Sequence, residues 1–384
     1  MDITALIAPW LNAIREQIPG IELFDAHTHL GQNDPDGMRQ TPDELLDGLR
    51  AADARGCFVF PMHELDGYAP ANDFVIETAA QFDGLLVPFC RVKPGEGALQ
   101  EAERALARGA KGIKLHPRAE QFTLDHPDVP RLFALANERT LPILIHAGRG
   151  IPALGEHVIG YAQQFPNARA ILAHAGVSDL AWIWRACVDL PNLLFDSAWW
   201  IPDDLLALFS LVPPAQILFA SDAPYGATAI SAAAQLRLAI QAGLTPEQLT
   251  LIASGQSFRI AKGKPLAVAG PPAGERDRAS HVLLDRVANL LQIATILEFR
   301  MGDSGELTAL ATLACDVPDE IDDAPVFAAI RRLLRAYEVA HAADPEDRSV
   351  HALLILATSI AMTPDVPLPA AGDQLPTVPL PDQP

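Results

Sequence analysis

Residues 21–30 read IELFDAHTHL, a short apolar run that ends in two histidines. Seven similar runs follow: CFVFPMH (57–63), LLVPFCRV (85–92), GIKLHP (112–117), PILIHAG (142–148), RAILAHAG (169–176), NLLFDSAWW (192–200) and QILFASD (216–222). Amphipathic stretches separate them, with helix-start signals such as Thr41-Pro42-Asp43. Eight strands that alternate with helices over about 220 residues favour a closed parallel sheet over an open one. The sequence therefore predicts an α/β fold, a (β/α)8 TIM barrel.

The composition limits the partners that the protein can have. The chain has 384 residues, and 28 Lys plus Arg against 48 Asp plus Glu give a formal net charge of −20. Such a surface repels phosphate groups, so we expect no nucleic-acid partner. No apolar run approaches the roughly 18 to 20 residues of a membrane span, and no targeting signal precedes the first helix. We therefore expect a cytoplasmic protein with no membrane partner.

The sequence changes character on both sides of the barrel. Beyond residue 264 the chain contains 8 arginines, no lysine and 18 acidic residues, and its apolar residues follow helical periods. The last 22 residues contain seven prolines and little to bury. The predicted division is an N-terminal helix at 1–20, the barrel at 21–264, a linker at 265–276, a helical extension at 277–362 and a disordered or extended tail at 363–384. We expect the extension to pack on the barrel or to form a homo-oligomer.

Histidines gather where the predicted strands end. Six of the eleven lie at or just past a strand's carboxyl end: His27, His29, His63, His116, His146 and His174. In a (β/α)8 barrel these ends meet at one mouth, where the active sites of the fold are built. Two residues apart on a strand, His27 and His29 point to the same face. With His146, His174 and Asp222 they offer nitrogen and oxygen ligands suited to one divalent ion, zinc or a similar metal.

Five motifs resemble a known family in content and order. DAHTHL, GIKLHP, ILIHAG, ILAHAG and ASDAP are similar to motifs of the amidohydrolase superfamily. The resemblance covers about residues 21–262 and is strongest to the amidohydrolase-related branch, which includes metal-dependent decarboxylases related to aminocarboxymuconate-semialdehyde decarboxylase. It implies a distorted TIM barrel with His27, His29, His146 and Asp222 as metal ligands and His174 as the strand 6 histidine. Residues 255–259, GQSFR, depart from the family pattern, which weakens only the subgroup assignment.

The resemblance and the ligand chemistry imply a metal-dependent hydrolase that cleaves a C–N or C–O bond of a small molecule. A metal-activated water is the expected nucleophile. Asp222 would take up its proton, and His174 would orient or polarise the substrate carbonyl. One alternative is a non-hydrolytic decarboxylase, a carboxy-lyase, on the same site. The other is a catalytically idle barrel whose acidic extension is an interaction module.

Five residues near the mouth are candidates for substrate binding: Arg91, Lys114, His116, Trp199 and Trp200. Arg91 could equally form a structural ion pair with an acidic residue at the rim. Lys114 should point inward, where an unpaired ammonium is costly. Some relatives carry a carbamylated lysine on strand 4 that bridges two metals. Because His116 lies nearer the end of the strand than Lys114, we expect one metal, with a second as the alternative.

Overall fold

The computed structural model describes residues 3–95, 97–148, 150–275, 281–302 and 304–370. Every predicted apolar run contains a strand: β1 Leu23–Leu30, β2 Ala54–Pro61, β3 Leu86–Pro88, β4 Cys90–Arg91, β5 Ile113–Leu115, β6 Pro142–Ile145, β7 Arg169–Leu172, β8 Leu193–Asp196 and β9 Ile217–Leu218. The third run is split into β3 and β4 at Phe89, next to Pro88, which has no N–H to donate to the sheet.

The strands form a closed parallel barrel, which confirms the predicted fold. Hydrogen-bonded neighbours follow the chain order in two groups, β1 to β3 and β4 to β9. At one end, the Lys111 N–H, just before β5, donates to the Pro88 carbonyl of β3 at 2.7 Å. At the other end, the Ala26 N–H of β1 donates to the carbonyl of Phe219, just after β9, at 2.9 Å. These two bonds join the groups and close the ring.

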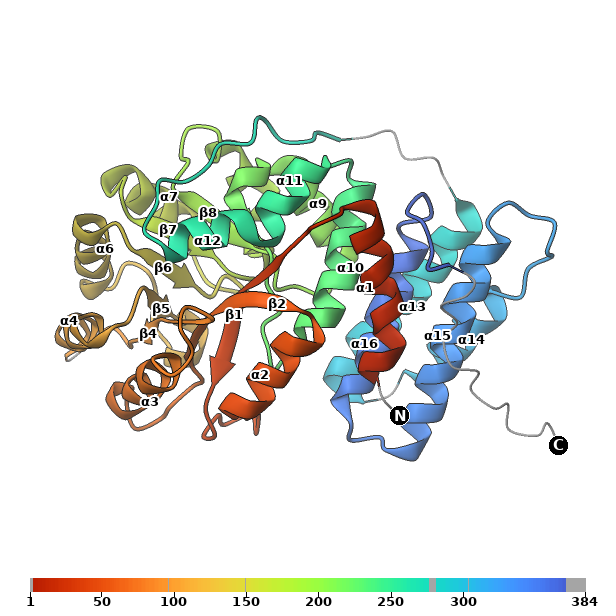
Figure 1. The fold of residues 1–384 in the computed structure, drawn as a ribbon, viewed down its shortest axis with the longest axis horizontal. Helices are drawn as coiled ribbons and strands as arrows, with labels where there is room; N and C mark the ends of the chain where they lie inside the picture. The colour runs from red at the N-terminus through yellow and green to blue at the C-terminus, as the bar shows by residue number, and fades with distance from the viewer. Residues whose placement is uncertain (1–2, 96, 149, 276–280, 303, 371–384) are drawn as a thin grey trace.

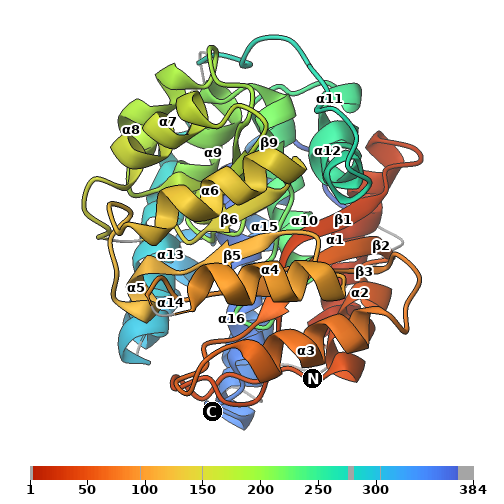
Figure 2. The same cartoon turned by 90° about the vertical axis from the view of Figure 1, so that its left-hand side faces the viewer.

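Helices cover the outside of the ring. They are α2 Pro42–Ala51, α3 Ala69–Ala79, α4 Ala98–Arg108, α5 Pro117–Glu120, α6 Asp128–Arg139, α7 Leu154–Gln164, α8 Leu180–Ile183, α9 Pro202–Leu211, α10 Thr228–Gln241, α11 Pro246–Thr250 and α12 Gln256–Ala261. Figure 2 shows α3, α4 and α6 lying in front of the strands. Inside the ring, an apolar cluster that includes Phe24, Phe58, Phe60 and Phe89 fills the space between the strands. This filled interior leaves the strand ends as the place for a site.

The N-terminal helix and the extension lie together on one side of the barrel (Figure 1). The helices are α1 Ile3–Gln17, α13 Val282–Met301, α14 Gly305–Ala314, α15 Ala324–Ala343 and α16 His351–Ala361. Both α1 and α16 pack against α10 of the barrel. The apolar residues of the outer barrel, α1 and the extension form one continuous cluster. The extension therefore packs on the barrel, which was one of the two arrangements expected from the sequence.

The buried Arg237 of α10 anchors the end of the extension. Its guanidinium donates to the carbonyls of Thr363 at 3.1 Å, Val366 at 3.0 Å and Pro367 at 2.8 Å. Thr363 and Val366 are buried. A buried arginine therefore holds the backbone at the start of the predicted tail against the barrel. The rest of the predicted tail, 371–384, and residues 276–280 at the linker lie outside the described residues.

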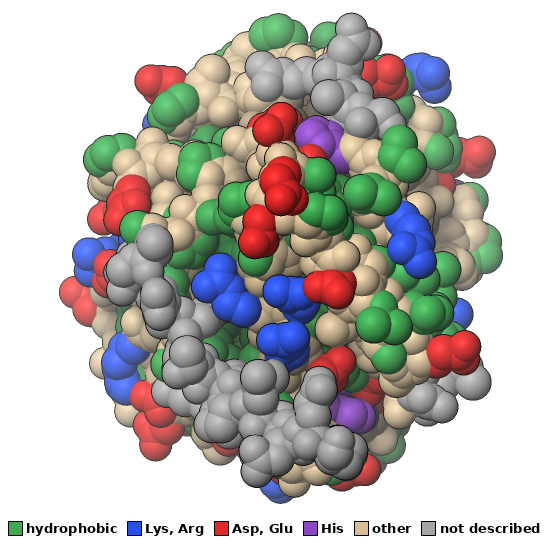
Figure 3. All heavy atoms as spheres, turned by 90° about the vertical axis from the view of Figure 1, so that its right-hand side faces the viewer, with side chains coloured by type: hydrophobic (Ala, Val, Ile, Leu, Met, Phe, Trp, Pro, Cys, Tyr) green, Lys and Arg blue, Asp and Glu red, His purple; other side chains and the backbone are tan. Residues whose placement is uncertain are grey.

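Large apolar side chains remain on the surface of the extension. Val282 is 73% exposed, Leu283 is 51% exposed and Leu313 is 70% exposed. Figure 3 shows hydrophobic side chains lying among charged ones on this side of the molecule. Homo-oligomer formation through the extension stays a prediction. Among the described residues, no helix has the length and apolar character to cross a membrane.

Candidate metal centre

Three of the predicted ligands meet at the barrel mouth. The Nε2 atoms of His27 and His29 are 3.2 Å apart. Asp222 Oδ1 lies 3.0 Å from His27 Nε2 and 3.1 Å from His29 Nε2. His27 and His29 come from β1, and Asp222 follows β9, its neighbour across the closure of the ring. The two-residue spacing on β1 thus places both imidazoles on one face, as expected.

The second pair of histidines adjoins this group. His174 follows β7, and its Nε2 lies 2.9 Å from Nδ1 of His146, which follows β6. One ligand atom each from His27, His174 and Asp222 lie within 4.8 Å of one another. The structure therefore groups His174 with two of the predicted ligands, and His146 contacts that group through His174.

Two hydrogen bonds fix which nitrogen of each imidazole faces the group. His27 Nδ1 lies 2.7 Å from Oδ2 of Asp196, a buried carboxylate at the end of β8. His174 Nδ1 lies 2.7 Å from the carbonyl oxygen of Ala198. Both oxygens can only accept, so in the neutral form of each imidazole Nδ1 carries the proton and Nε2 keeps a lone pair. Both lone pairs belong to nitrogens of the candidate centre.

Asp196 is a functional residue that the sequence reasoning missed. Its other oxygen, Oδ1, accepts from the backbone N–H groups of His174 at 2.9 Å and Ala198 at 3.1 Å. One carboxylate therefore orients the side chain of His27 and the backbone of His174. The signal was available in the run NLLFDSAWW, where Asp196 ends a strand, as His146 and His174 follow theirs.

Asp25 plays a related part through the backbone. Its Oδ1 accepts from the N–H of Ser221 at 2.9 Å and of His27 at 3.2 Å, and its Oδ2 accepts from the Thr228 hydroxyl at 2.8 Å. The carboxylate that accepts from the His27 imidazole is that of Asp196, not that of Asp25. Asp25 instead joins β1 to the segment that carries Asp222.

The protonation states of Asp222, His29 and His174 match those of metal ligands. Burial opposes ionisation of Asp222, but His27, His29 and His174 hold its pKa well below the usual range. Burial lowers the pKa of His29 to about 3 and also lowers the pKa of His174. Burial and Lys114 oppose protonation of His27, yet Asp222 and Asp196 raise its pKa. The Asp222 carboxylate therefore faces two neutral imidazoles, His29 and His174. The raised pKa of His27 favours a proton that a metal would have to displace, because metal binding needs deprotonated ligands of these types.

Lys114 lies beside the group rather than on the rim. It is fully buried, with Nζ 3.3 Å from His27 Nε2 and 4.6 Å from the centre of the Phe60 ring. Burial lowers the pKa of its ammonium to about 7. An inward lysine was expected, and its nitrogen is close enough to the histidines to act on whatever they bind.

The donor set fits a divalent ion. Three nitrogen or oxygen atoms from separate side chains converge within 3.2 Å. These three atoms are a carboxylate oxygen and two imidazole nitrogens, the ligand types that a divalent ion of this kind prefers. Zinc accepts this combination of imidazole and carboxylate ligands.

The other predicted residues line two adjoining cavities. The mouth cavity, of about 450 Å³, is lined by His27, His29, His63, Arg91, Lys114 and His116. The extension cavity, of about 920 Å³, is lined by Trp199, Trp200 and residues of the extension. His146, His174 and Asp222 line both. The structure thus brings every predicted site residue to one region.

Two mouth residues are already engaged by the protein. Arg91 Nη2 lies 2.6 Å from Oε1 of Glu120, and both side chains are buried. This is the structural ion pair that the sequence left open for Arg91. His116 caps α5 by accepting from the Ala119 N–H at 3.1 Å, and its ring stacks on His146 at 3.8 Å. Both residues support the mouth from within.

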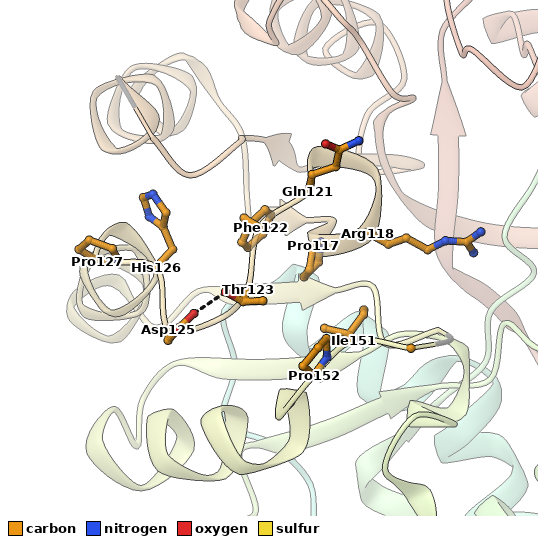
Figure 4. A pocket seen from close by; sticks show the side chains of 11 residues that line it. Pro117, Arg118, Gln121, Phe122, Thr123, Asp125, His126, Pro127, Ile151 and Pro152 are labelled. Carbon is orange, nitrogen blue, oxygen red and sulfur yellow. Dashed lines mark hydrogen bonds between the residues drawn. The ribbon is translucent and has the colours of Figure 1, made fainter.

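Arg118 was not singled out from the sequence. It lines both cavities and is exposed. It also borders a third, more open pocket of about 590 Å³ formed by α5 and the loops around it. Figure 4 shows the Arg118 side chain pointing away from the other labelled residues of that pocket. A guanidinium at the rim can bind anionic groups that approach the mouth.

Comparison with known proteins identifies the barrel. A family model described as amidohydrolase matches residues 24–255. The chain belongs to the amidohydrolase family. This confirms the resemblance and the prediction of an enzyme barrel. The match ends before the helical extension begins. A comparison with curated proteins found no matching sequence.

Solved structures similar to this chain share the barrel. They include a TIM-barrel protein from Bordetella bronchiseptica with 16% identity, covering 66% of this chain and 90% of that one at a TM-score of 0.50. Two others, also at a TM-score of 0.50, each cover 63% of this chain and 99% of their own: a Staphylococcus aureus putative amidohydrolase with 17% identity and Sphingomonas paucimobilis 5-carboxyvanillate decarboxylase with 14%. At these identities the likeness supports the fold.

Proposed function

We propose that this amidohydrolase is a metal-dependent hydrolase that cleaves a C–N or C–O bond of a small molecule. The observation that carries the proposal is the convergence of His27 Nε2, His29 Nε2 and Asp222 Oδ1 within 3.2 Å at the barrel mouth. A divalent ion held there would supply an acidified water at neutral pH. The pair His146 and His174 would provide a further ligand.

The protein groups around the ligands have separate tasks. Asp222 is ionised and can accept the proton of an attacking water and return it to the leaving group. Asp196 keeps the lone pair of His27 directed at the ligand group. Lys114 can donate to a developing negative charge on the substrate from its position beside His27.

Two histidines, His146 and His174, are candidates for the fourth ligand. The resemblance assigns that place to His146, whereas the distances group His174 with His27 and Asp222. Alanine substitution of each histidine, followed by zinc titration, separates them, because losing the ligand weakens zinc binding and losing a catalytic residue does not. Elemental analysis after growth with zinc and bicarbonate gives the metal number. Two metals per chain that fall to one in Lys114→Ala would contradict the single-metal proposal.

Turnover assays test the reaction class. The zinc-loaded protein is offered lactones, N-acyl amides and unsaturated carboxylic acids, and both hydrolysis products and carbon dioxide are measured. Hydrolysis products without carbon dioxide support the proposal. Carbon dioxide release would show that the decarboxylase alternative is right. No turnover of any class by zinc-loaded protein would favour the idle barrel.

A further inference from the structure

The extension contributes a wall of the cavity next to the candidate metal centre. The extension cavity is lined on the barrel side by His174, Trp199, Trp200 and Asp222. On the extension side it is lined by residues of α13, α15 and α16: Glu298, Phe299, His341, His351 and Ile355. Its volume of about 920 Å³ is within the range of small-molecule sites. All of these extension residues lie outside the family match, which ends at residue 255.

Aromatic rings run without a break along this cavity. The Trp199 ring lies 6.2 Å from the ring of His174 and 5.5 Å from that of Trp200. The Trp200 ring in turn lies 4.9 Å from Phe299, and Phe299 lies 5.1 Å from His351. The barrel tryptophans and the extension phenylalanine thus form one apolar wall. Phe299 is 40% exposed, which leaves part of its ring available for contact with a ligand.

The wall ends at a buried carboxylate. Glu298 is 5% exposed, and its Oε1 lies 3.4 Å from His351 Nε2 and 4.0 Å from His341 Nδ1. Burial opposes its ionisation, but nearby hydroxyls of Ser304 and Tyr337 and the two histidines lower the pKa of Glu298. Burial lowers the pKa of His351, so this imidazole is a poor source of compensating positive charge.

A buried carboxylate is stabilised by a positive charge or by strong hydrogen-bond donors. The described residues place no lysine or arginine within 4.0 Å of Glu298. The arginines that line the same cavity, Arg118, Arg300 and Arg348, are exposed. Two hydroxyls and His351 already face this carboxylate, but its Oε2 is buried with no hydrogen-bond partner among the described residues. This oxygen of Glu298 is therefore suited to receive a donor from a ligand in the cavity.

We propose that the extension provides the specificity end of the substrate site. The substrate class is an elongated molecule with an apolar or aromatic middle, which lies along Trp200 and Phe299. Its far end carries an amine, which donates to Glu298, while its reacting group faces Asp222. This proposal rests on the proposed function for the reacting end alone, and the amine end can be tested without turnover.

The test compares two probes of one shape and opposite charge, 4-phenylbutylamine and 4-phenylbutyrate. Their binding to the full chain is measured by tryptophan fluorescence and calorimetry, with zinc and after treatment with a chelator. The amine should bind about tenfold or more tightly than the butyrate in metal-free protein, as a charge-assisted hydrogen bond predicts. Glu298→Gln should remove this preference, and Phe299→Ala should weaken binding of the amine.

Glu346 provides the matched control because it lines the same cavity but is exposed. Glu346→Gln should keep the preference for the amine. A preference that survives in folded Glu298→Gln would overturn the proposal and leave Glu298 with a structural role. Failure of the native protein to bind the amine would also overturn it. If the amine binds through Glu298 but zinc-loaded protein turns over no substrate, the proposed function fails and this inference stands.

Discussion

Asp196→Asn should weaken metal binding without removing a ligand. In the native protein, Asp196 Oδ1 accepts from two backbone N–H groups, and Oδ2 accepts from His27 Nδ1 at 2.7 Å. An asparagine amide has the same shape but offers one oxygen and one NH2 group. If the oxygen stays with the backbone donors, the NH2 group faces His27 Nδ1. The imidazole must then move its proton to Nε2, which directs an N–H at the candidate metal centre.

The magnitudes favour this outcome over a flipped amide. Flipping would set the NH2 group against two buried backbone donors, and each unsatisfied donor costs about 1–3 kcal/mol. Shifting the proton of His27 avoids both costs. Changes to groups that orient a metal ligand usually reduce affinity by about 10- to 100-fold, which corresponds to about 1.4–2.7 kcal/mol. We expect a loss of zinc affinity in this range.

Competition with a chromophoric chelator measures the zinc affinity, and nitrogen NMR of labelled histidine reports which His27 nitrogen carries the proton. Asp204→Asn is the control, because Asp204 accepts from the Trp199 indole at 2.6 Å and contacts none of the predicted ligands. Its zinc affinity should stay native. Folded Asp196→Asn protein with native zinc affinity and an unchanged tautomer would refute the reasoning.

Three further predictions concern the ligands, the anchor at Arg237 and the ionisation of Asp222. His27→Ala or Asp222→Ala should abolish metal-dependent turnover while circular dichroism stays native, and full activity at low metal would contradict the ligand assignment. In thermal unfolding, Arg237→Met should lower the free energy of unfolding by about 3 kcal/mol, because it leaves buried carbonyls without a hydrogen-bond donor. Arg259→Met, which loses one solvent-exposed hydrogen bond, should lower the free energy of unfolding by about 0.5 kcal/mol or less. The pKa of Asp222 is lowered in the folded state, so the stabilisation from its ionised form is present above about pH 4 and is lost as the pH falls further. In metal-free Asp222→Asn protein, the free energy of unfolding should therefore fall less steeply with decreasing pH.

The strand-end histidines were predictable because their positions depend on local patterns. Alternation of apolar runs and helices predicts a barrel, and a barrel brings all its strand ends together. The two-residue spacing of His27 and His29 then decides their common direction. Contacts between side chains from different strands of the ring cannot be predicted from such local patterns. Asp196 is 169 residues from His27, and Glu120 competes with any ligand for Arg91.

The extension could be predicted as helical but not placed. Its apolar periods describe which face is buried, not the surface that buries it. Residues 363–370 illustrate the difference, because their proline content suggests an unpacked segment. A distant arginine, Arg237, nevertheless binds three of their carbonyls. Glu298 likewise looks like one acid among many until its place beside the barrel mouth is known.

One helix connects the two halves of the proposed site. α10 begins with Thr228, whose hydroxyl donates to Asp25, the residue that holds the backbone beside Asp222. One turn before its end, α10 carries Arg237, which anchors the chain that follows α16. The same rigid helix therefore positions the reacting end and the extension that bears Glu298. A shared support of this kind keeps the distance between the two ends constant, as selection of a substrate by length requires.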